Sequence, residues 1–150
     1  MADFFNWVKE DGPRVAGTRD IDRSKVQAPG IVPLPDGGYR LYYTAVGPGR
    51  PFEECQGYIL SAVSDDGLHF ELEDGVRVAQ DRDVEAFSVY APEVLRLAAG
   101  GYRMYYAGWM AAPEVAAGSK YHGRIFSAFS DDGVDWRKDP DICIDNGGRW

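Results

Sequence analysis

The sequence of 150 residues contains only two cysteines, Cys55 and Cys143, and only two histidines. Two cysteines are too few for a disulfide framework, so we expect two unpaired thiols in a reducing cytoplasm. No second histidine stands at ligand spacing, and we predict no metal site and no cofactor. No apolar run approaches the length of a membrane span. The N-terminus, MADFFNWVKEDG, has no basic region followed by an apolar one. A cytoplasmic location is therefore predicted.

Basic residues are also in the minority, with 16 Lys and Arg against 24 Asp and Glu, for a net charge of −8. This balance argues against nucleic acid and anionic membranes as partners, because both are bound through basic patches. It is compatible with a neutral ligand and with a site built from carboxylates. The aromatic content of 13%, with Tyr as the commonest ring, favours β-structure.

The chain repeats itself after 63 residues. The stretch VQAPGIVPLPDGGYRLYYTAV at 26–46 returns as VYAPEVLRLAAGGYRMYYAGWM at 89–110, so that Ala28 corresponds to Ala91 and Tyr42 to Tyr105. Further along, the turn SDDG at 64–67 returns at 130–133. A repeat of this length decides the fold class.

Each unit predicts four antiparallel strands joined by hairpins. The expected strands are 30–34, 39–46, 57–64 and 69–78 in the first unit, and 93–97, 102–109, 123–130 and 136–144 in the second. Glycines in the tight turns at 35–38 and 64–67 supply the positive φ that short hairpins require. The strand type at 69–78 and 136–144, apolar at both ends with a polar kink between, also stands at 6–15.

Four-stranded repeats of this kind are typical of β-propeller blades. We therefore predict an all-β chain with two complete blades, 28–78 and 91–144, and a leading outer strand, 7–15, that completes another blade. A two-sheet sandwich is the alternative, but it does not explain the threefold return of one strand type. Two blades cannot close a ring, since propellers have about four to eight. The chain is thus expected to be part of a larger propeller, as a truncation or as one portion of a split protein. Assembly of several copies into a ring is the weaker alternative, because the leading outer strand would then duplicate the strand 136–144 of its neighbour.

The alternation of strand direction predicts where a site would lie. The link between blades (16–25 and 79–88) and the long loop (47–56 and 110–122) share one rim, and the tight turns share the other. We call the first the link rim. Binding residues commonly lie on long loops carried by a rigid frame, so the site is expected at the link rim.

Carboxylates and aromatic rings gather at the link rim. This combination suits a sugar site, because rings stack on apolar sugar faces while carboxylates bind hydroxyls or transfer protons. The candidate catalytic residues are Asp20, Asp22, Asp83 and Glu93. The candidate substrate-binding residues are Arg19, Gln27, Arg82, Glu85, Tyr90, Trp109, Tyr121 and His122. The charged link residues have a second interpretation, as structural ion pairs or turn caps, and Trp109 has one as packing between blades.

Glu93 is the strongest candidate for a functional carboxylate. Its equivalent in the first unit is Gly30, so folding does not need a carboxylate at this position. An acidic residue that faces a central channel would lower the stability of the fold unless it had a function or a partner for its charge. We therefore favour a functional role for Glu93.

The motifs APEV, GGYRMYY and SDDGVDW resemble those of the five-bladed β-propeller glycoside hydrolases, which include arabinanases, β-xylosidases, invertases and levansucrases. The resemblance covers about 7–144 and implies an axial site with three carboxylates: a base or nucleophile in the first blade, a pKa-tuning Asp and a general acid in a later blade. Asp20 or Asp22 lies where the first carboxylate is expected. Arg82-Asp83 resembles the Arg-Asp pair of the invertases, but Val84 replaces its Pro.

The same resemblance would put the general acid at position 27 or 90, where Gln and Tyr stand and cannot serve. The acid is then expected in blades outside this chain, or the protein is not a hydrolase. We predict a glycoside hydrolase-like propeller that cleaves a neutral glycan or oligosaccharide with paired carboxylates, with part of its active site missing from this chain. A non-catalytic carbohydrate-binding or scaffold propeller is the alternative. Expected partners are a small carbohydrate and further blades, from a longer chain or from self-association.

Overall fold

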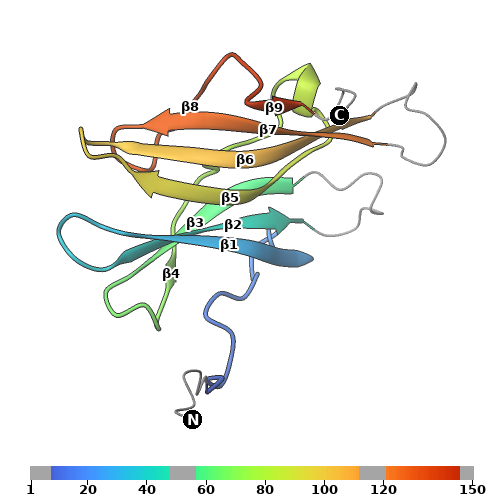
Figure 1. Ribbon diagram of the computed structural model, residues 1–150. Coiled ribbons are helices and arrows are strands. Elements are labelled where there is room, and N and C mark those ends of the chain that lie inside the picture. Colours follow the sequence, from blue (N-terminus) through green and yellow to red (C-terminus); the bar gives the residue numbers. More distant parts are fainter. Residues whose placement is uncertain (1–7, 48–56, 112–120, 146–150) are drawn as a thin grey trace, which may run out of the picture.

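The computed structural model describes residues 8–47, 57–111 and 121–145, which form two antiparallel sheets that lie against each other (Figure 1). These residues form strands, tight turns and one short 3₁₀ helix, η2 (Asp83–Glu85). Within these ranges, no helix is long and apolar enough to cross a membrane. The predicted all-β architecture is confirmed.

The two sheets repeat one strand order. Blade 1 has the order β1-β2-β3-β4, with β1 at Lys25–Pro33, β2 at Tyr39–Val46, β3 at Gly57–Ser64 and β4 at Glu71–Leu72. Blade 2 has the order β5-β6-β7-β8, with β5 at Ser88–Arg96, β6 at Tyr102–Ala111, β7 at Tyr121–Ser130, β8 at Arg137–Lys138, and a further strand, β9 (Ile144–Asp145), on β7. Every pairing between neighbouring strands is antiparallel, as the repeat predicts.

The inner strands begin earlier than the sequence predicts. β1 begins at Lys25 rather than at residue 30, and β5 begins at Ser88 rather than at residue 93. A register shift lies inside each strand, around the Ala-Pro pair. Ala28 and Ala91 have φ values of 51° and 53°, in the left-handed region. The proline thus occupies a bulge within the strand instead of marking its start.

The outer strands are broken rather than continuous. In blade 1, β4 is followed only by a single bridge between Val78 and Ile59, and in blade 2 the outer position is divided between β8 and β9. Residues 8–15 form no strand, so the leading strand expected at 7–15 is not seen in the described part of that segment. An outer strand forms only where a neighbouring strand of the same blade can hydrogen-bond with it. In blades 1 and 2 the outer position is already occupied by residues of the blade itself, so residues 8–15 have no strand to pair with there.

The main hydrophobic core lies between the two blades, and we call this contact the seam. Its buried residues come from both sides, with Val32, Tyr42 and Ile59 from blade 1 facing Met104 and Phe126 from blade 2. A second, smaller cluster covers the opposite face of blade 1 and consists of Tyr43, Ala45, Leu60 and Ala62. Alternate residues along β2 thus face opposite sides of the sheet, which is the period-two pattern of a strand buried on both faces.

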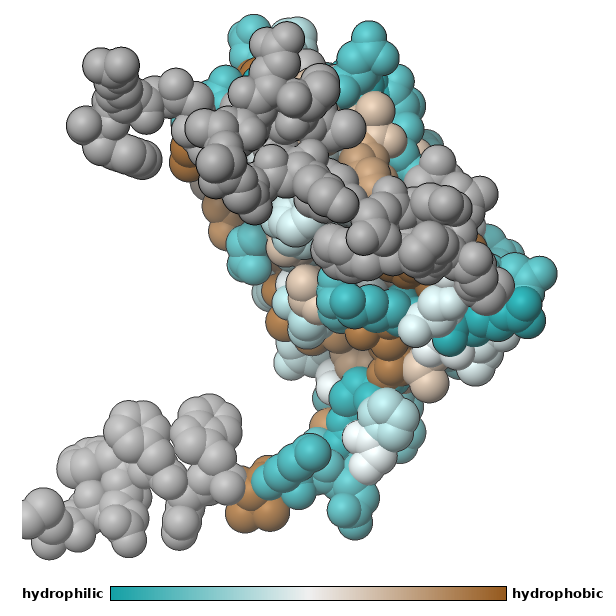
Figure 2. Space-filling model, turned by 90° about the vertical axis from the view of Figure 1, so that its right-hand side faces the viewer, coloured by the Kyte–Doolittle hydropathy of each residue, from teal (hydrophilic) through white to brown (hydrophobic). Residues whose placement is uncertain are grey.

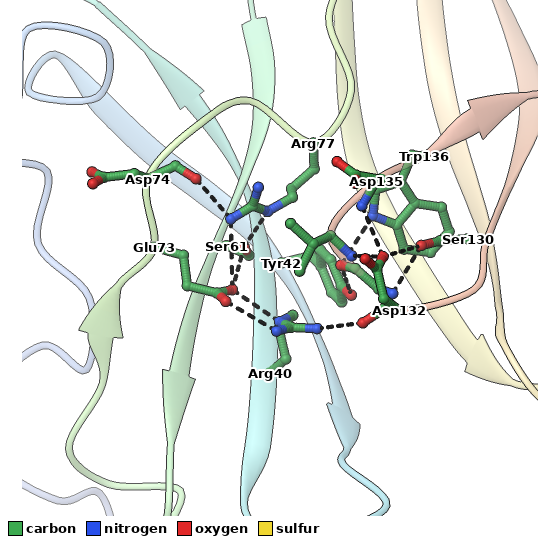
Figure 3. A network of polar contacts seen from close by, with 12 residues as sticks. Arg40, Tyr42, Ser61, Glu73, Asp74, Arg77, Ser130, Asp132, Asp135 and Trp136 are labelled. Atoms are coloured by element: carbon green, nitrogen blue, oxygen red, sulfur yellow. Dashed lines mark hydrogen bonds and ion pairs between the residues drawn. The ribbon is translucent and has the colours of Figure 1, made fainter.

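A tight turn of blade 2 docks on β2 of blade 1 (Figure 3). The Tyr42 hydroxyl donates to the Gly133 carbonyl at 2.7 Å, and Arg40 Nη1 donates to the Asp132 carbonyl at 3.0 Å. Trp136 packs edge-on against Tyr42, with 5.7 Å between ring centroids. The turn is braced from within, because Gly133 N–H donates to Ser130 Oγ at 2.8 Å. The contact between the blades is therefore made by hydrogen bonds to the backbone of this turn as well as by the apolar core.

Arg40 also holds the outer edge of blade 1. Its guanidinium makes two hydrogen bonds to Glu73, at 2.9 and 3.0 Å, and Ser61 Oγ donates to the same carboxylate at 2.6 Å (Figure 3). Burial would raise the pKa of Glu73, but the bonds from Arg40 and Ser61 outweigh it and hold this pKa below its ordinary value. Arg77 Nε completes the network by donating to Ser61 Oγ at 2.7 Å.

The inner strands of the two blades, β1 and β5, approach each other closely at Gly30. A Cβ at this position would lie 2.4 Å from the Pro92 carbonyl oxygen of β5. We expect Gly30→Ala to lower the free energy of unfolding by about 1–3 kcal/mol, because the two inner strands must move apart. Glu93→Ala, at the equivalent and exposed position of blade 2, is the control and should change stability by less than about 0.5 kcal/mol. Urea denaturation measures both, and equal effects of the two substitutions would contradict this account.

The Glu73 network makes stability depend on pH. The pKa of Glu73 is lower in the folded protein than its ordinary value of 4.5. Its bonds therefore stabilise the fold fully above about pH 4.5, and this contribution is lost as the pH falls through the folded pKa. We expect Glu73→Gln to cost about 1.5–3 kcal/mol at pH 7 and to flatten the fall in stability toward acid pH. Denaturation midpoints measured from pH 7 to 3 test this, with the exposed Glu71→Gln as control. An unchanged acid slope in Glu73→Gln would refute it.

Candidate functional site

The first link is anchored by a buried ion pair. Arg19 Nε donates to Asp22 Oδ2 at 2.9 Å, and the Arg19 backbone N–H donates to Asp22 Oδ1 at 2.8 Å. Arg19 also reaches the Tyr43 hydroxyl in β2, at 3.0 Å. The Asp22 side chain is fully buried, and burial raises the pKa of Tyr43. These contacts fasten the start of β1 to the face of its own blade.

The second link repeats this arrangement with one substitution. Arg82 makes hydrogen bonds to both carboxylate oxygens of Glu85, at 3.1 and 3.2 Å, and Glu85 takes the place of Asp22. The Tyr106 hydroxyl in β6 donates to Glu85 Oε2 at 3.1 Å, and Lys138 also pairs with this carboxylate. Burial raises the pKa of Tyr106. Glu85 is fully buried, so the interpretation of the link charges as structural ion pairs applies to both links.

The pairs join residues three apart rather than the adjacent Arg-Asp residues of the sequence motif. Asp20 and Asp83, which follow the two arginines directly, are exposed instead. Asp20 pairs at the surface with Arg23, at 3.1 Å. Glu93 is exposed on β5. Within the part of the chain that the structure describes, no hydrogen bond links Asp20, Asp83 and Glu93 with one another.

A cleft opens at the seam, at the link rim. In Figure 1 the starts of β1 and β5 lie on the same side as η2, opposite the hairpin turns. The cleft encloses about 70 Å³, and its walls come from both blades. Its lining residues are Lys25, Gln27, Thr44, Val46, Phe87, Ser88, Tyr90 and Trp109. Figure 2 looks at this rim and shows hydrophobic surface between hydrophilic residues.

Two aromatic rings form one wall of the cleft. Tyr90 and Trp109 pack edge to face, with 5.1 Å between centroids and an interplanar angle of 84°. Burial raises the pKa of Tyr90, so its hydroxyl stays protonated at neutral pH. Gln27 reaches the cleft from the other blade and offers an amide that can both donate and accept. Apolar rings beside uncharged polar groups are the chemistry of a small-molecule site.

The two bulges aim Gln27 and Tyr90 at the cleft. Each residue directly precedes the Ala-Pro pair at which its strand shifts register. The left-handed conformation of Ala91 costs on the order of 1–3 kcal/mol, and a contact across the seam supports it. Ala91 N–H donates to Thr44 Oγ1 of blade 1 at 2.9 Å. The bulge of one blade is therefore held by a side chain of the other.

The structure thus brings together three of the predicted binding residues: Gln27, Tyr90 and Trp109. Arg19 and Arg82 lie in the link pairs with Asp22 and Glu85. Tyr121 and His122 begin β7, and their side chains lie outside the described part. Among the described residues, no group of three or more His, Cys, Asp or Glu side chains is arranged to hold a metal ion.

Sequence reasoning missed the other residues of the cleft, which are Lys25, Thr44, Val46, Phe87 and Ser88. Lys25 and Ser88 are equivalent positions, each two residues before a predicted binding residue, because the strand extends back through the bulge. The period of two along a strand could have identified them. Thr44 faces the seam with no pattern to mark it, since its equivalent in blade 2 is Ala107.

The link pairs generate a stability prediction. We expect Asp22→Asn and Glu85→Gln each to lower the free energy of unfolding by about 2–4 kcal/mol, because each leaves a half-buried arginine without its counter-charge. Asp20→Asn, at an exposed carboxylate of the same link, is the matched control and should stay within about 0.5 kcal/mol. Guanidinium unfolding curves provide the measurement. A stability of Asp22→Asn equal to that of Asp20→Asn would exclude an anchoring role.

No protein-family model matches the chain. Two curated relatives, uncharacterized protein Rv1502 of Mycobacterium tuberculosis strain H37Rv and uncharacterized protein MT1551 of strain CDC 1551, are each 36% identical over 107 residues. The match covers 70% of this chain and 32% of each relative. The chain therefore spans about a third of the length of the curated relatives that it matches.

Solved structures match over most of the described chain. Zg3597, a family 117 glycoside hydrolase of Zobellia galactanivorans, has a TM-score of 0.66 at 21% identity and covers 91% of this chain and 45% of its own. A glycosyl hydrolase of Bacteroides ovatus has a TM-score of 0.61 at 24% identity, over 75% of this chain and 30% of its own. A structure from work on GH130 enzymes that target β-1,2 mannosidic linkages in Candida mannan has a TM-score of 0.63 at 22% identity, over 79% of this chain and 32% of its own. The chain has the blade fold of the β-propeller glycoside hydrolases.

Proposed function

We propose that this chain forms part of a glycoside hydrolase-like propeller that binds a neutral glycan at the link rim. One observation carries the proposal: the seam cleft combines the paired rings of Tyr90 and Trp109 with the amide of Gln27. A flat ring suits the apolar face of a sugar, and an amide can bond neighbouring hydroxyls. The net charge of −8 suits an uncharged ligand better than a phosphorylated one.

Cleavage of a glycosidic bond would need a pair of carboxylates, one protonated and one ionised. Asp20, Asp83 and Glu93 are the exposed candidates in this chain, because Asp22 and Glu85 are buried in the link pairs. We propose that an exposed carboxylate of the link rim acts with a general acid from another blade. We place the general acid in another blade because positions 27 and 90, where it was expected, carry Gln and Tyr in this chain.

A second function, carbohydrate binding without catalysis, is favoured by the lining of the cleft. Among the described residues that line it there is no Asp or Glu. The two functions predict different results for the carboxylate variants Asp20→Asn, Asp83→Asn and Glu93→Gln. Loss of turnover with retained binding would identify an enzyme. Sugar binding without turnover in the native protein would identify a binding propeller.

Binding is testable on Trp109. We expect a neutral oligosaccharide, with a β-1,2-linked mannobiose among the probes because of the GH130 neighbour, to change the tryptophan fluorescence. Trp109→Ala should weaken binding about tenfold, because it removes about 1.4 kcal/mol of ring contact. Trp109→Phe should keep most of the affinity. His69→Ala, at an exposed side chain beside the turn at 64–67, is the control. Equal affinity of Trp109→Ala and the native protein would refute a sugar site in this cleft.

A further inference from the structure

The seam opens a second time at the rim that carries the tight turns, opposite the link rim. We call this opening the turn cavity. It encloses about 390 Å³, a volume in the usual range of small-molecule sites, whereas the cleft at the link rim encloses about 70 Å³. Its walls come from both blades at their own contact. Its polar lining consists of Asp36, Arg40, Arg96, Tyr102, Asp131 and Asp132.

Three of the five charged groups in this lining already have partners. Arg40 makes two hydrogen bonds to Glu73, at 2.9 and 3.0 Å, and also donates to the Asp132 carbonyl (Figure 3). Asp131 pairs with Arg137 at 2.9 Å. Asp132 Oδ1 accepts two backbone N–H groups of its own turn, at 2.8 and 2.9 Å. These bonds hold the turn and the seam in place.

Arg96 and Asp36 are the other two charged groups, and they have no partner. Within the described ranges, neither side chain makes a hydrogen bond or an ion pair. Both depart from the repeat, because Arg96 is equivalent to Pro33 and Asp36 to Ala99. The blade framework therefore needs neither charge. Blade 1 supplies only the carboxylate and blade 2 only the cation, so the two meet only across the seam.

Tyr102 adds an unpartnered hydroxyl to the same wall. It lies directly opposite Arg96 in the pairing of β5 with β6, so both side chains project from the face that looks into the seam. Tyr102 is 5% exposed, yet its hydroxyl makes no hydrogen bond to any described residue and is not sealed off from solvent. A buried tyrosine hydroxyl usually has a partner, as that of Tyr42 does in the Gly133 carbonyl at 2.7 Å.

The free charges determine which class of ligand fits. A simple anion would bind Arg96 but would also meet Asp36 and the acidic turn at 130–133, and a simple cation would be repelled by Arg96. A ligand with one carboxylate and one ammonium group complements both free charges. A guanidinium can also bond a carboxylate through two parallel N–H groups, which makes this the strongest contact available in the cavity.

We propose that the turn cavity binds a small zwitterion of the amino acid class. Arg96 and the Tyr102 hydroxyl donate to its carboxylate, and Asp36 accepts from its ammonium group across the seam. Because the ligand then contacts both blades, its binding also stabilises the folded protein. This inference goes beyond the sugar-binding proposal and does not depend on it, since the two sites lie at opposite rims.

Titration of the ¹⁵N-labelled protein with glycine, 4-aminobutyrate and 6-aminohexanoate tests the site. The three probes differ in the spacing between carboxylate and ammonium, so one of them should bind more tightly than the others. We expect saturable shifts of the amides of Gly100 and Gly101, which line the cavity, and no shift of the Trp109 indole. Acetate and ethylamine, at matched ionic strength, should each bind at least about tenfold more weakly than the best amino acid, because each satisfies one charge only.

Three substitutions assign the contacts. Arg96→Gln and Asp36→Asn should each weaken binding at least about tenfold, and Tyr102→Phe about fivefold. Arg96 and Asp36 are exposed, and unchanged circular dichroism and melting temperature without ligand would show that the variants are folded. Arg23→Gln, at an exposed guanidinium of the link rim, is the matched control and should bind like the native protein.

Several results would overturn the proposal. One is the absence of saturable shifts at Gly100 and Gly101 with all three amino acids. Another is acetate binding as tightly as the best amino acid, which would indicate a simple anion site. A neutral oligosaccharide that shifts these amides when the amino acids do not would replace the zwitterion with a sugar. Equal affinity of the native protein, Arg96→Gln and Asp36→Asn would exclude the assigned contacts.

Discussion

The hydrogen bond from the Tyr42 hydroxyl to the Gly133 carbonyl, at 2.7 Å, stands at the centre of the structure. It fixes a turn of one blade against a strand of the next, and the buried rings of the seam pack around it. Neither blade could bury its apolar face alone, because a single sheet needs a second layer. The seam is therefore what makes two repeats one folded unit, and the cleft at the link rim exists only because the seam brings the inner strands together.

The same seam connects fold and site through Thr44. Its hydroxyl accepts the Ala91 N–H, and this contact holds the left-handed bulge that directs Tyr90 toward Trp109. Strain of this kind persists where the surroundings over-determine the conformation. The links contribute in a different way, because their buried Arg19–Asp22 and Arg82–Glu85 pairs position the starts of the inner strands. The carboxylates of the links are thus of two kinds: Asp22 and Glu85 are buried in structural ion pairs, whereas Asp20 and Asp83 are exposed.

The repeat made the blade architecture predictable, since glycine turns and aromatic strands return at fixed offsets. It also predicted that Gln27, Tyr90 and Trp109 lie near one another, because inner-strand starts and strand ends meet at one rim; the three residues line one cleft, and their role in binding stays a prediction. The start of the inner strands was predicted wrongly, since Pro29 and Pro92 suggested a boundary and instead occupy a bulge. The burial of Asp22 and Glu85 could not be predicted, because a charged side chain in a link is expected to be exposed. Their burial depends on the Arg and Tyr side chains that bond to them, and these contacts appear only in the structure.

The central claim is that the seam cleft, and not the opposite rim, receives a neutral sugar. It is tested most directly by the indole N–H resonances of the ¹⁵N-labelled protein during titration with an oligosaccharide. The account predicts a shift of the Trp109 resonance, whereas the Trp136 indole, which donates to the Gly133 carbonyl at 3.1 Å, should not move. A shift of Trp136 with Trp109 unchanged would contradict the account.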